Sequence, residues 1–175
     1  MEFIVFCDGS VLSNNQTGIG IYITKGNPYN TQARLMAEGF RQSSEVAKFV
    51  AVIYALQIIP DDRPIRIITD SNYVLHLNSW CYIWTRRQWQ VADQHNLEFH
   101  RVLTNLLRSR RHPVTIEQST GEVGSEKATK KATKGSIQKV HMIMGLGDGL
   151  ATPNGNDSNY THTLRTTTPT LDHVN

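Results

Sequence analysis

The sequence predicts an α/β protein built on a five-stranded mixed sheet, with three antiparallel strands, two parallel strands and flanking helices. Three β-prone stretches joined by short loops occupy the first 40 residues, which is typical of an antiparallel meander. From residue 46 the apolar residues change to helical spacing, and strands and helices then alternate. A chain of 175 residues with 39% hydrophobic residues has enough apolar material for one domain and a tail.

Each predicted strand has its own signal in the sequence. The continuous apolar run 3–7 indicates a buried strand, and Asp8-Gly9-Ser10 after it indicates a turn. Residues 18–24 alternate between apolar and small or polar residues, and residues 32–40 complete the meander with a less regular alternation. The fourth and fifth strands are predicted at residues 65–69 and 113–117.

The first helix has the clearest periodicity. Its apolar residues follow the i, i+3, i+4, i+7 pattern, and Pro60 ends it. Ser43 or Ser44 is the predicted N-cap, which places Glu45 in the first turn, where a carboxylate suits the helix dipole. Further helices are predicted at residues 74–84, 96–108 and 126–134.

The last part of the chain differs in composition from the rest. Residues 145–175 are rich in Gly, Asn and Thr and contain few apolar side chains. Such a segment buries too little surface to offset its conformational entropy, so we expect a disordered, low-complexity tail at 136–175. The folded domain is then predicted to span residues 1–135.

Several classes of protein are disfavoured by composition. No apolar run approaches the length of a membrane span, and Met1 to Asp8 is too short for a signal peptide. Two cysteines are too few for a disulfide framework, and the seven histidines show no zinc-binding spacing. We therefore expect an intracellular protein, with neither a membrane partner nor zinc.

Three acidic residues stand where predicted elements begin or end. Asp8 follows the first strand, Glu45 opens the first helix and Asp70 follows the fourth strand. If the first and fourth strands are neighbours, the three carboxylates meet at one sheet edge, where open α/β sheets bind ligands. Oxygen ligands alone suit Mg²⁺ or Mn²⁺. The alternative is that all three are ordinary surface acids.

Several motifs together resemble type 1 ribonuclease H over residues 1–134. The string Phe6-Cys7-Asp8-Gly9-Ser10 is similar to the family's opening strand, and Glu45 occupies the corresponding place in its first helix. The string 67–74, which contains Asp70, matches the family's fourth-strand motif almost residue for residue. The tryptophan-bearing basic segment 80–93 resembles the one that many members use to hold the substrate.

This resemblance implies an endonuclease that cleaves the RNA strand of an RNA–DNA hybrid with two Mg²⁺ ions, for which Mn²⁺ can substitute. Asp8 would bridge both ions, while Glu45 and Asp70 would each complete one coordination shell. Contacts with the hybrid would come from residues in five parts of the chain. These are Gly9, Ser10, Arg41, Gln42, Asn72, Arg86, Arg87, Trp89 and Asn96.

Two positions depart from the family pattern. Ser119 stands where a loop histidine is usual, and Thr129 stands where a fourth aspartate is usual. A serine cannot shuttle a proton near neutral pH, and a threonine adds no charge to hold the second ion. We further expect that Glu122, in the same loop, partly replaces the lost acid.

These departures leave two functions open. One is a working but slowed ribonuclease H, in which three acids still hold the metal ions. The other is a non-catalytic nucleic-acid-binding module derived from a reverse-transcribing element, which would bind hybrids in a salt-sensitive way.

The charge distribution is compatible with either function. Residues 85–112 hold six basic and two acidic side chains, a net charge of +4, whereas the whole chain carries +3. Such a segment is either a solvated helix face or a patch that faces phosphates. Trp89, within this segment, has two interpretations as well, namely packing and contact with nucleic acid.

Overall fold

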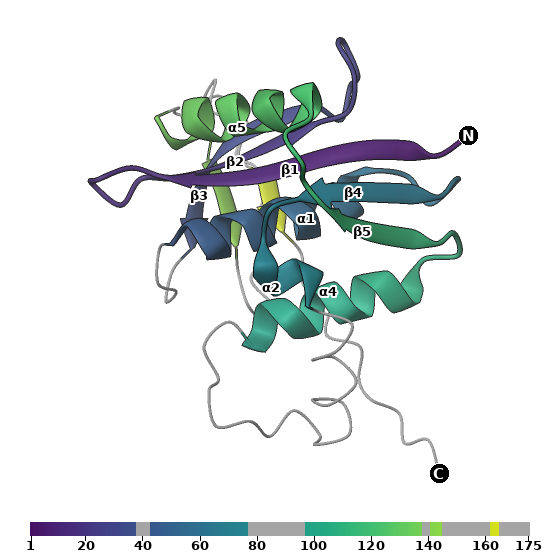
Figure 1. Ribbon diagram of the computed structural model, residues 1–175. Coiled ribbons are helices and arrows are strands. Elements are labelled where there is room, and N and C mark those ends of the chain that lie inside the picture. The colour runs from purple at the N-terminus through teal and green to yellow at the C-terminus, as the bar shows by residue number, and fades with distance from the viewer. Residues whose placement is uncertain (38–42, 77–96, 138–140, 145–161, 165–175) are drawn as a thin grey trace, which may run out of the picture.

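A mixed β-sheet forms the centre of the fold, as the computed structural model shows for residues 1–37, 43–76, 97–137, 141–144 and 162–164 (Figure 1). Its strands lie in the order β5-β4-β1-β2-β3-β6-β7. The strands are β1 (Phe3–Val11), β2 (Thr17–Tyr22), β3 (Thr31–Ala37), β4 (Ile65–Thr69), β5 (Val114–Gln118), β6 (His141–Met144) and β7 (His162–Leu164). The helices are α1 (Ser44–Ile58), α2 (Asn72–Leu75), α4 (Leu97–Ser109) and α5 (Val123–Ser136).

The first five strands form the predicted mixed sheet. β1, β2 and β3 pair in antiparallel fashion, while β4 lies parallel to β1 and β5 lies parallel to β4. The predicted fold class is therefore confirmed.

Two short strands extend the sheet beyond β3, from the stretch that the sequence predicts to be disordered. β6 pairs with β3 and β7 pairs with β6, both in parallel. Met142-Ile143-Met144 is a short apolar run in a polar stretch, and the edge of β3 offers unpaired backbone groups to it. The sheet thus has seven strands where five were predicted, while the domain boundary at residue 135 stays a prediction.

The first strand is longer than predicted. β1 continues through Asp8-Gly9-Ser10 to Val11, so the predicted turn at these residues is wrong. The reason lies in its partner, because β2 pairs with β1 as far as Val11, with Asp8 opposite Gly20 and Ser10 opposite Gly18. Asp8 is therefore held in an extended ladder on one side of β1.

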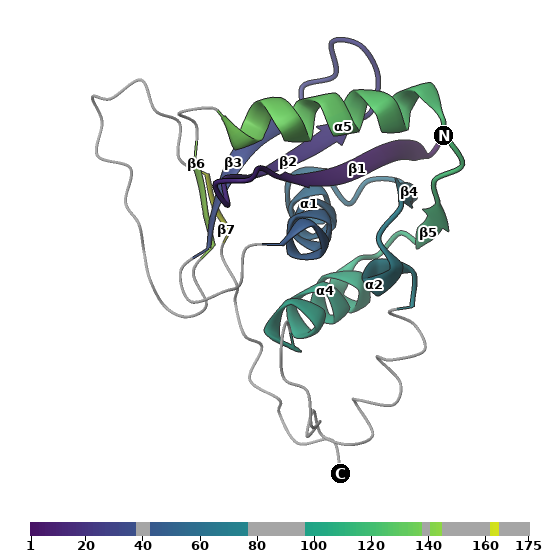
Figure 2. The same cartoon turned by 60° about the vertical axis from the view of Figure 1, so that its left-hand side comes forward.

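Helix α5 lies on one face of the sheet, whereas α1 and α4 lie on the other (Figure 2). Its contact with the sheet is unusually close because the strands carry glycines there. A Cβ atom added at Gly18 or Gly20 would clash with the backbone of α5 at Ala132 or Ala128. The buried small residues Ala128 and Ala132 complete this backbone-to-backbone packing. Short side chains on both elements therefore fix the position of α5 over β1, β2 and β3.

Helix α1 is buried on nearly every side between the sheet and α4. Ser43 is its N-cap, and the Ser43 hydroxyl accepts a hydrogen bond from the backbone N–H of Val46 at 3.2 Å. On the α4 side, Phe49 packs against Phe99 and His100, with ring centroids 6.4 Å and 4.6 Å apart. None of the described helices is long and apolar enough to span a membrane.

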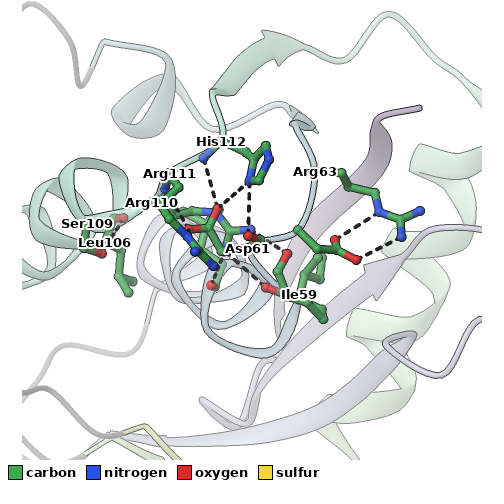
Figure 3. Close-up of polar contacts among 11 residues, drawn as sticks. Ile59, Asp61, Arg63, Leu106, Ser109, Arg110, Arg111 and His112 are labelled. Atoms are coloured by element: carbon green, nitrogen blue, oxygen red, sulfur yellow. Dashed lines mark hydrogen bonds and ion pairs between the residues drawn. The ribbon is translucent and has the colours of Figure 1, made fainter.

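An arginine cluster joins the end of α1 to the connection between α4 and β5 (Figure 3). The Arg110 guanidinium donates hydrogen bonds to the carbonyl oxygens of Leu56, Ile59 and Pro60 at 2.8–3.1 Å. Only 6% of the Arg110 side chain is exposed. Arg110 is thus used inside the fold, and it contributes no free charge to a phosphate-facing patch.

Candidate active site

The strand register brings two of the predicted carboxylates to one edge of the sheet. The parallel ladder between β1 and β4 ends at Phe6 opposite Ile68. If this register is continued by two residues, Asp8 lies opposite Asp70. β4 ends at Thr69, so β1 has no β4 neighbour at the position of Asp8. Ser119 follows β5 at the same edge, and its backbone N–H donates to the Thr69 carbonyl at 2.9 Å.

The third carboxylate reaches this edge because α1 lies very close to β1. A Cβ atom at Gly9 would clash with the backbone of Ala47 and Lys48, so only glycine allows this approach. The first turn of α1 then lies beside Asp8. Glu45 in that turn accepts a hydrogen bond from the Ser71 hydroxyl at 3.3 Å. Ser71 is fully buried and caps α2, so it fixes Glu45 relative to the end of β4.

A lysine that the sequence analysis missed lies among these acids. The Lys48 ammonium is 3.1 Å from Asp70 Oδ1 and 3.7 Å from Glu45 Oε1, and 16% of its side chain is exposed. Burial alone would lower the pKa of Lys48, but the hydrogen bond that its ammonium donates to Asp70 and the charges of Asp70, Glu45 and Asp8 raise the pKa overall. A signal for it existed in the sequence, because Lys48 follows Glu45 by three residues and so shares its helix face.

Asp8 has its own partners on β1 and α5. Its Oδ1 accepts from the Gly9 backbone N–H at 2.8 Å, and its Oδ2 accepts from the Thr129 hydroxyl at 2.5 Å. Burial raises the pKa of Asp8, and these hydrogen bonds only partly oppose the shift. Thr129 on α5 therefore binds the Asp8 carboxylate directly, at the position where the sequence analysis expects a fourth acid to be missing.

The oxygen ligands that the three carboxylates offer suit a hard divalent cation such as Mg²⁺ or Mn²⁺. Within the described ranges, however, no three His, Cys, Asp or Glu side chains lie close enough together to hold a metal ion. The Lys48 ammonium already contacts both Glu45 and Asp70. The site thus contains the ligand types of a metal centre, but the Lys48 ammonium already occupies the space between two of its carboxylates.

The loop before α5 uses its own acid for structure. Glu122 accepts hydrogen bonds from the side chains of Ser119, Thr120 and Ser125 at 2.9–3.1 Å. Hydrogen bonds from its own backbone N–H, from Thr120 and from Ser119 lower the pKa of Glu122 to about 2. This arrangement gives no support to the expectation that Glu122 replaces the lost acid.

The remaining predicted substrate contacts divide into two groups. Gly9 and Ser10 lie in β1 beside Asp8, and Asn72 is an exposed residue at the start of α2, two positions after Asp70. These three therefore follow Asp8 or Asp70 by one or two residues in the chain. The others lie outside the described residues, namely Arg41, Gln42, Arg86, Arg87, Trp89 and Asn96.

Comparison with solved structures identifies the fold as RNase H-like. RNase H1 from the archaeon Halobacterium salinarum NRC-1 superimposes with a TM-score of 0.58 at 18% identity, covering 77% of this chain and 97% of that one. LC11-RNase H1, solved in complex with an RNA/DNA hybrid, gives a TM-score of 0.54 at 20% identity, covering 75% and 94%.

Sequence comparison gives the family. A family model described as RNase H matches residues 1–136, and the chain belongs to the RNase H family. Ribonuclease H of Pectobacterium atrosepticum is 29% identical over 126 residues, which cover 69% of this chain and 78% of the relative. Ribonuclease H of Orientia tsutsugamushi is 23% identical over 142 residues, covering 77% and 82%.

Proposed function

We propose that this protein is a ribonuclease H that hydrolyses the RNA strand of RNA–DNA hybrids, at a reduced rate. The observation that carries the proposal is that the elements bearing Asp8, Asp70 and Glu45 meet at one sheet edge, through the β1–β4 register and the close approach of α1 at Gly9. Membership of the RNase H family supports the same reaction.

In this proposal Asp8, Glu45 and Asp70 hold divalent metal ions. When bound, such ions would supply an activated water and stabilise the charge that develops on the leaving 3′ oxygen. The products would be a 3′-hydroxyl and a 5′-phosphate. Asp8 faces α5 as well as the sheet edge, and Thr129 orients it by a single hydrogen bond.

The reduced rate follows from the side chains around the acids. Ser119 cannot exchange a proton near neutral pH, and its hydroxyl is already bonded to Glu122 and Ser125. Thr129 orients Asp8 without adding negative charge. Both changes weaken functions that an acid or a histidine would supply, whereas the three metal-binding carboxylates remain.

Recognition of the hybrid is proposed for residues close in the chain to the acids. We propose that Gly9 and Ser10, which follow Asp8 in β1, and Asn72, which follows Asp70 by two residues, contact the 2′-hydroxyl groups that distinguish RNA from DNA. Outside the described residues, we propose that six others bind the hybrid's backbone and bases, namely Arg41, Gln42, Arg86, Arg87, Trp89 and Asn96.

One observation favours a second function, a hybrid-binding module without turnover. Each of the three carboxylates already has a partner from its own chain, namely Thr129 for Asp8, Ser71 and Lys48 for Glu45, and Lys48 for Asp70. A site whose acids are internally paired could persist after catalysis was lost.

The test is cleavage of a labelled RNA–DNA hybrid over a titration of Mg²⁺ and of Mn²⁺. We expect metal-dependent cleavage by the wild type and a loss of at least about a hundredfold in Asp70→Asn, because that change removes a metal ligand. Asp62→Asn is the matched control, since Asp62 pairs with Arg63 on an exposed loop. A wild type that binds the hybrid but does not cleave it at any metal concentration identifies the binding module instead.

A further inference from the structure

We propose that the Lys48 ammonium takes the place of one divalent cation in the carboxylate site. The inference rests on the proposed function in that it concerns the same three acids. It departs from the two-ion arrangement that the family resemblance implies, and it assigns to Lys48 the role of a resident counter-ion.

The position of Lys48 is that of a shared cation. Its Nζ lies 3.1 Å from Asp70 Oδ1 and 3.7 Å from Glu45 Oε1, so one ammonium contacts carboxylates from two different elements. Helical spacing places the Lys48 and Glu45 side chains on one face of α1. The backbone of α1 at Lys48 is fixed against Gly9, so this side chain starts from a defined point next to Asp8.

The charge of the cluster points to the same conclusion. With all four groups ionised, the three carboxylates and one ammonium carry a net charge of −2, which a single divalent ion neutralises. Two divalent ions would leave the cluster with a charge of +2 in a half-buried place, an unfavourable arrangement. Without Lys48 the cluster carries −3, and the second ion meets less repulsion.

Lys48 also has to leave Asp70 and Glu45 before another cation can bind between them. The Ser71 hydroxyl donates to the second oxygen of Glu45 at 3.3 Å, and this hydrogen bond opposes rotation of the carboxylate away from Lys48. The ammonium and a divalent ion therefore compete for the same oxygens. Lys48 restricts metal binding at this point and keeps the acids together when no metal is bound.

The test counts bound Mn²⁺ per chain by equilibrium dialysis and electron paramagnetic resonance, with the full chain and no nucleic acid. We expect Lys48→Met to bind one Mn²⁺ ion more than the wild type over the same concentration range. Met keeps the length of the side chain and removes its charge. Lys130→Met, at an exposed position of α5, is the matched control and should bind as many Mn²⁺ ions as the wild type does. Equal numbers of bound ions in wild type and Lys48→Met would overturn the proposal.

Thermal unfolding is a second measurement, and it remains informative if Lys48→Met folds poorly without metal. In metal-free buffer Lys48→Met should melt at a lower temperature than the wild type, since its acids repel one another, and Mg²⁺ should raise its Tm by more. Equal Mg²⁺-dependent shifts in Tm would contradict the inference. Neither measurement depends on cleavage, so the two proposals can fail separately. If Lys48→Met binds an extra ion but the wild type does not cleave the hybrid, the role of Lys48 stands and only the proposed function is contradicted.

Discussion

The pair formed by Asp8 and Thr129 determines how much negative charge faces the substrate side of the site. Thr129 donates its hydroxyl hydrogen to Asp8, while the Gly9 backbone N–H binds the other carboxylate oxygen. Both hydrogen bonds favour the ionised form of Asp8, against the burial that raises its pKa. Threonine therefore stabilises one carboxylate where an aspartate would add a second.

Thr129→Asp should increase hybrid cleavage by at least about tenfold at a fixed, limiting Mg²⁺ concentration, because a second carboxylate beside Asp8 strengthens metal binding. Initial rates across a Mg²⁺ titration measure the effect. Thr129→Asn is the control, since it has nearly the same shape as aspartate and no charge. A rate unchanged by Thr129→Asp would support the non-catalytic binding module.

His100 makes the stability of the core depend on pH. Its side chain is 1% exposed and packs on Phe49, and burial lowers its pKa to about 4. The unfolded chain, with a histidine pKa of about 6.5, takes up a proton at a higher pH than the folded chain does. Above about pH 6.5 His100 therefore does not reduce the unfolding free energy. As the pH falls from 6.5 to about 4, protonation of His100 in the unfolded chain lowers the unfolding free energy progressively.

The wild type should lose up to about 2 kcal/mol of unfolding free energy between about pH 7.5 and about pH 5 because of this one group. Urea unfolding at the two pH values measures the loss. His100→Gln cannot ionise at this position, so its unfolding free energy should fall much less than that of the wild type between the two pH values. If the variant loses as much stability as the wild type over the same interval, the assignment to His100 is wrong.

At the scale of single elements, the contact between α5 and the sheet sets the position of Thr129. The backbone of α5 lies directly on Gly18 and Gly20 of β2, and Gly135 of α5 lies on Ala33 of β3 in the same way. Side chains would separate these elements. Glycines at these three positions thus bring Thr129 within hydrogen-bond distance of Asp8.

Gly20→Ala should lower the unfolding free energy by about 1–3 kcal/mol, because the added methyl group overlaps the α5 backbone at Ala128. Denaturant unfolding monitored by circular dichroism provides the measurement. The exposed α5 variant Lys130→Ala serves as the control, with an expected change within about 0.5 kcal/mol. A Gly20→Ala variant as stable as this control would show that α5 does not lie so close to β2.

The elements were predictable to different degrees. The helical periodicity of α1 and the apolar runs of β1 and β4 place Asp8, Glu45 and Asp70 near element ends, which is enough to predict that they converge. The extension of β1 to Val11 could not be predicted in the same way. Asp8-Gly9-Ser10 has the local composition of a turn, and only pairing with β2 holds it extended.

At the scale of the whole molecule, the C-terminal end of the basic segment 85–112 stabilises the fold. Arg110 binds three carbonyl oxygens at the end of α1, and Asp61 accepts backbone hydrogen bonds from Arg111 and His112. Composition alone could not reveal this, since a buried arginine and a phosphate-binding one count equally in a net charge. Arg86 and Arg87 remain predicted contacts with the hybrid.

The contacts of Lys48 depend on how distant parts of the chain pack together, which local sequence patterns do not determine. The i, i+3 spacing from Glu45 was visible, but the contact with Asp70 depends on how α1 docks against β1 near the end of β4. The strands β6 and β7 were missed for a similar reason, because an open edge of β3 decides whether a short apolar run pairs. In both cases the decisive partner is far away in the sequence.

The acids at this sheet edge are proposed to support metal-dependent cleavage of RNA paired with DNA. The most direct measurement labels each strand of a hybrid separately, incubates it with the full chain and Mg²⁺ or Mn²⁺, and analyses the ends of the products. We predict that only the RNA strand is cut, leaving 3′-hydroxyl and 5′-phosphate ends, and that single-stranded RNA and duplex DNA stay intact. Cleavage of the DNA strand, or no cleavage of either strand in both metals, would contradict the claim.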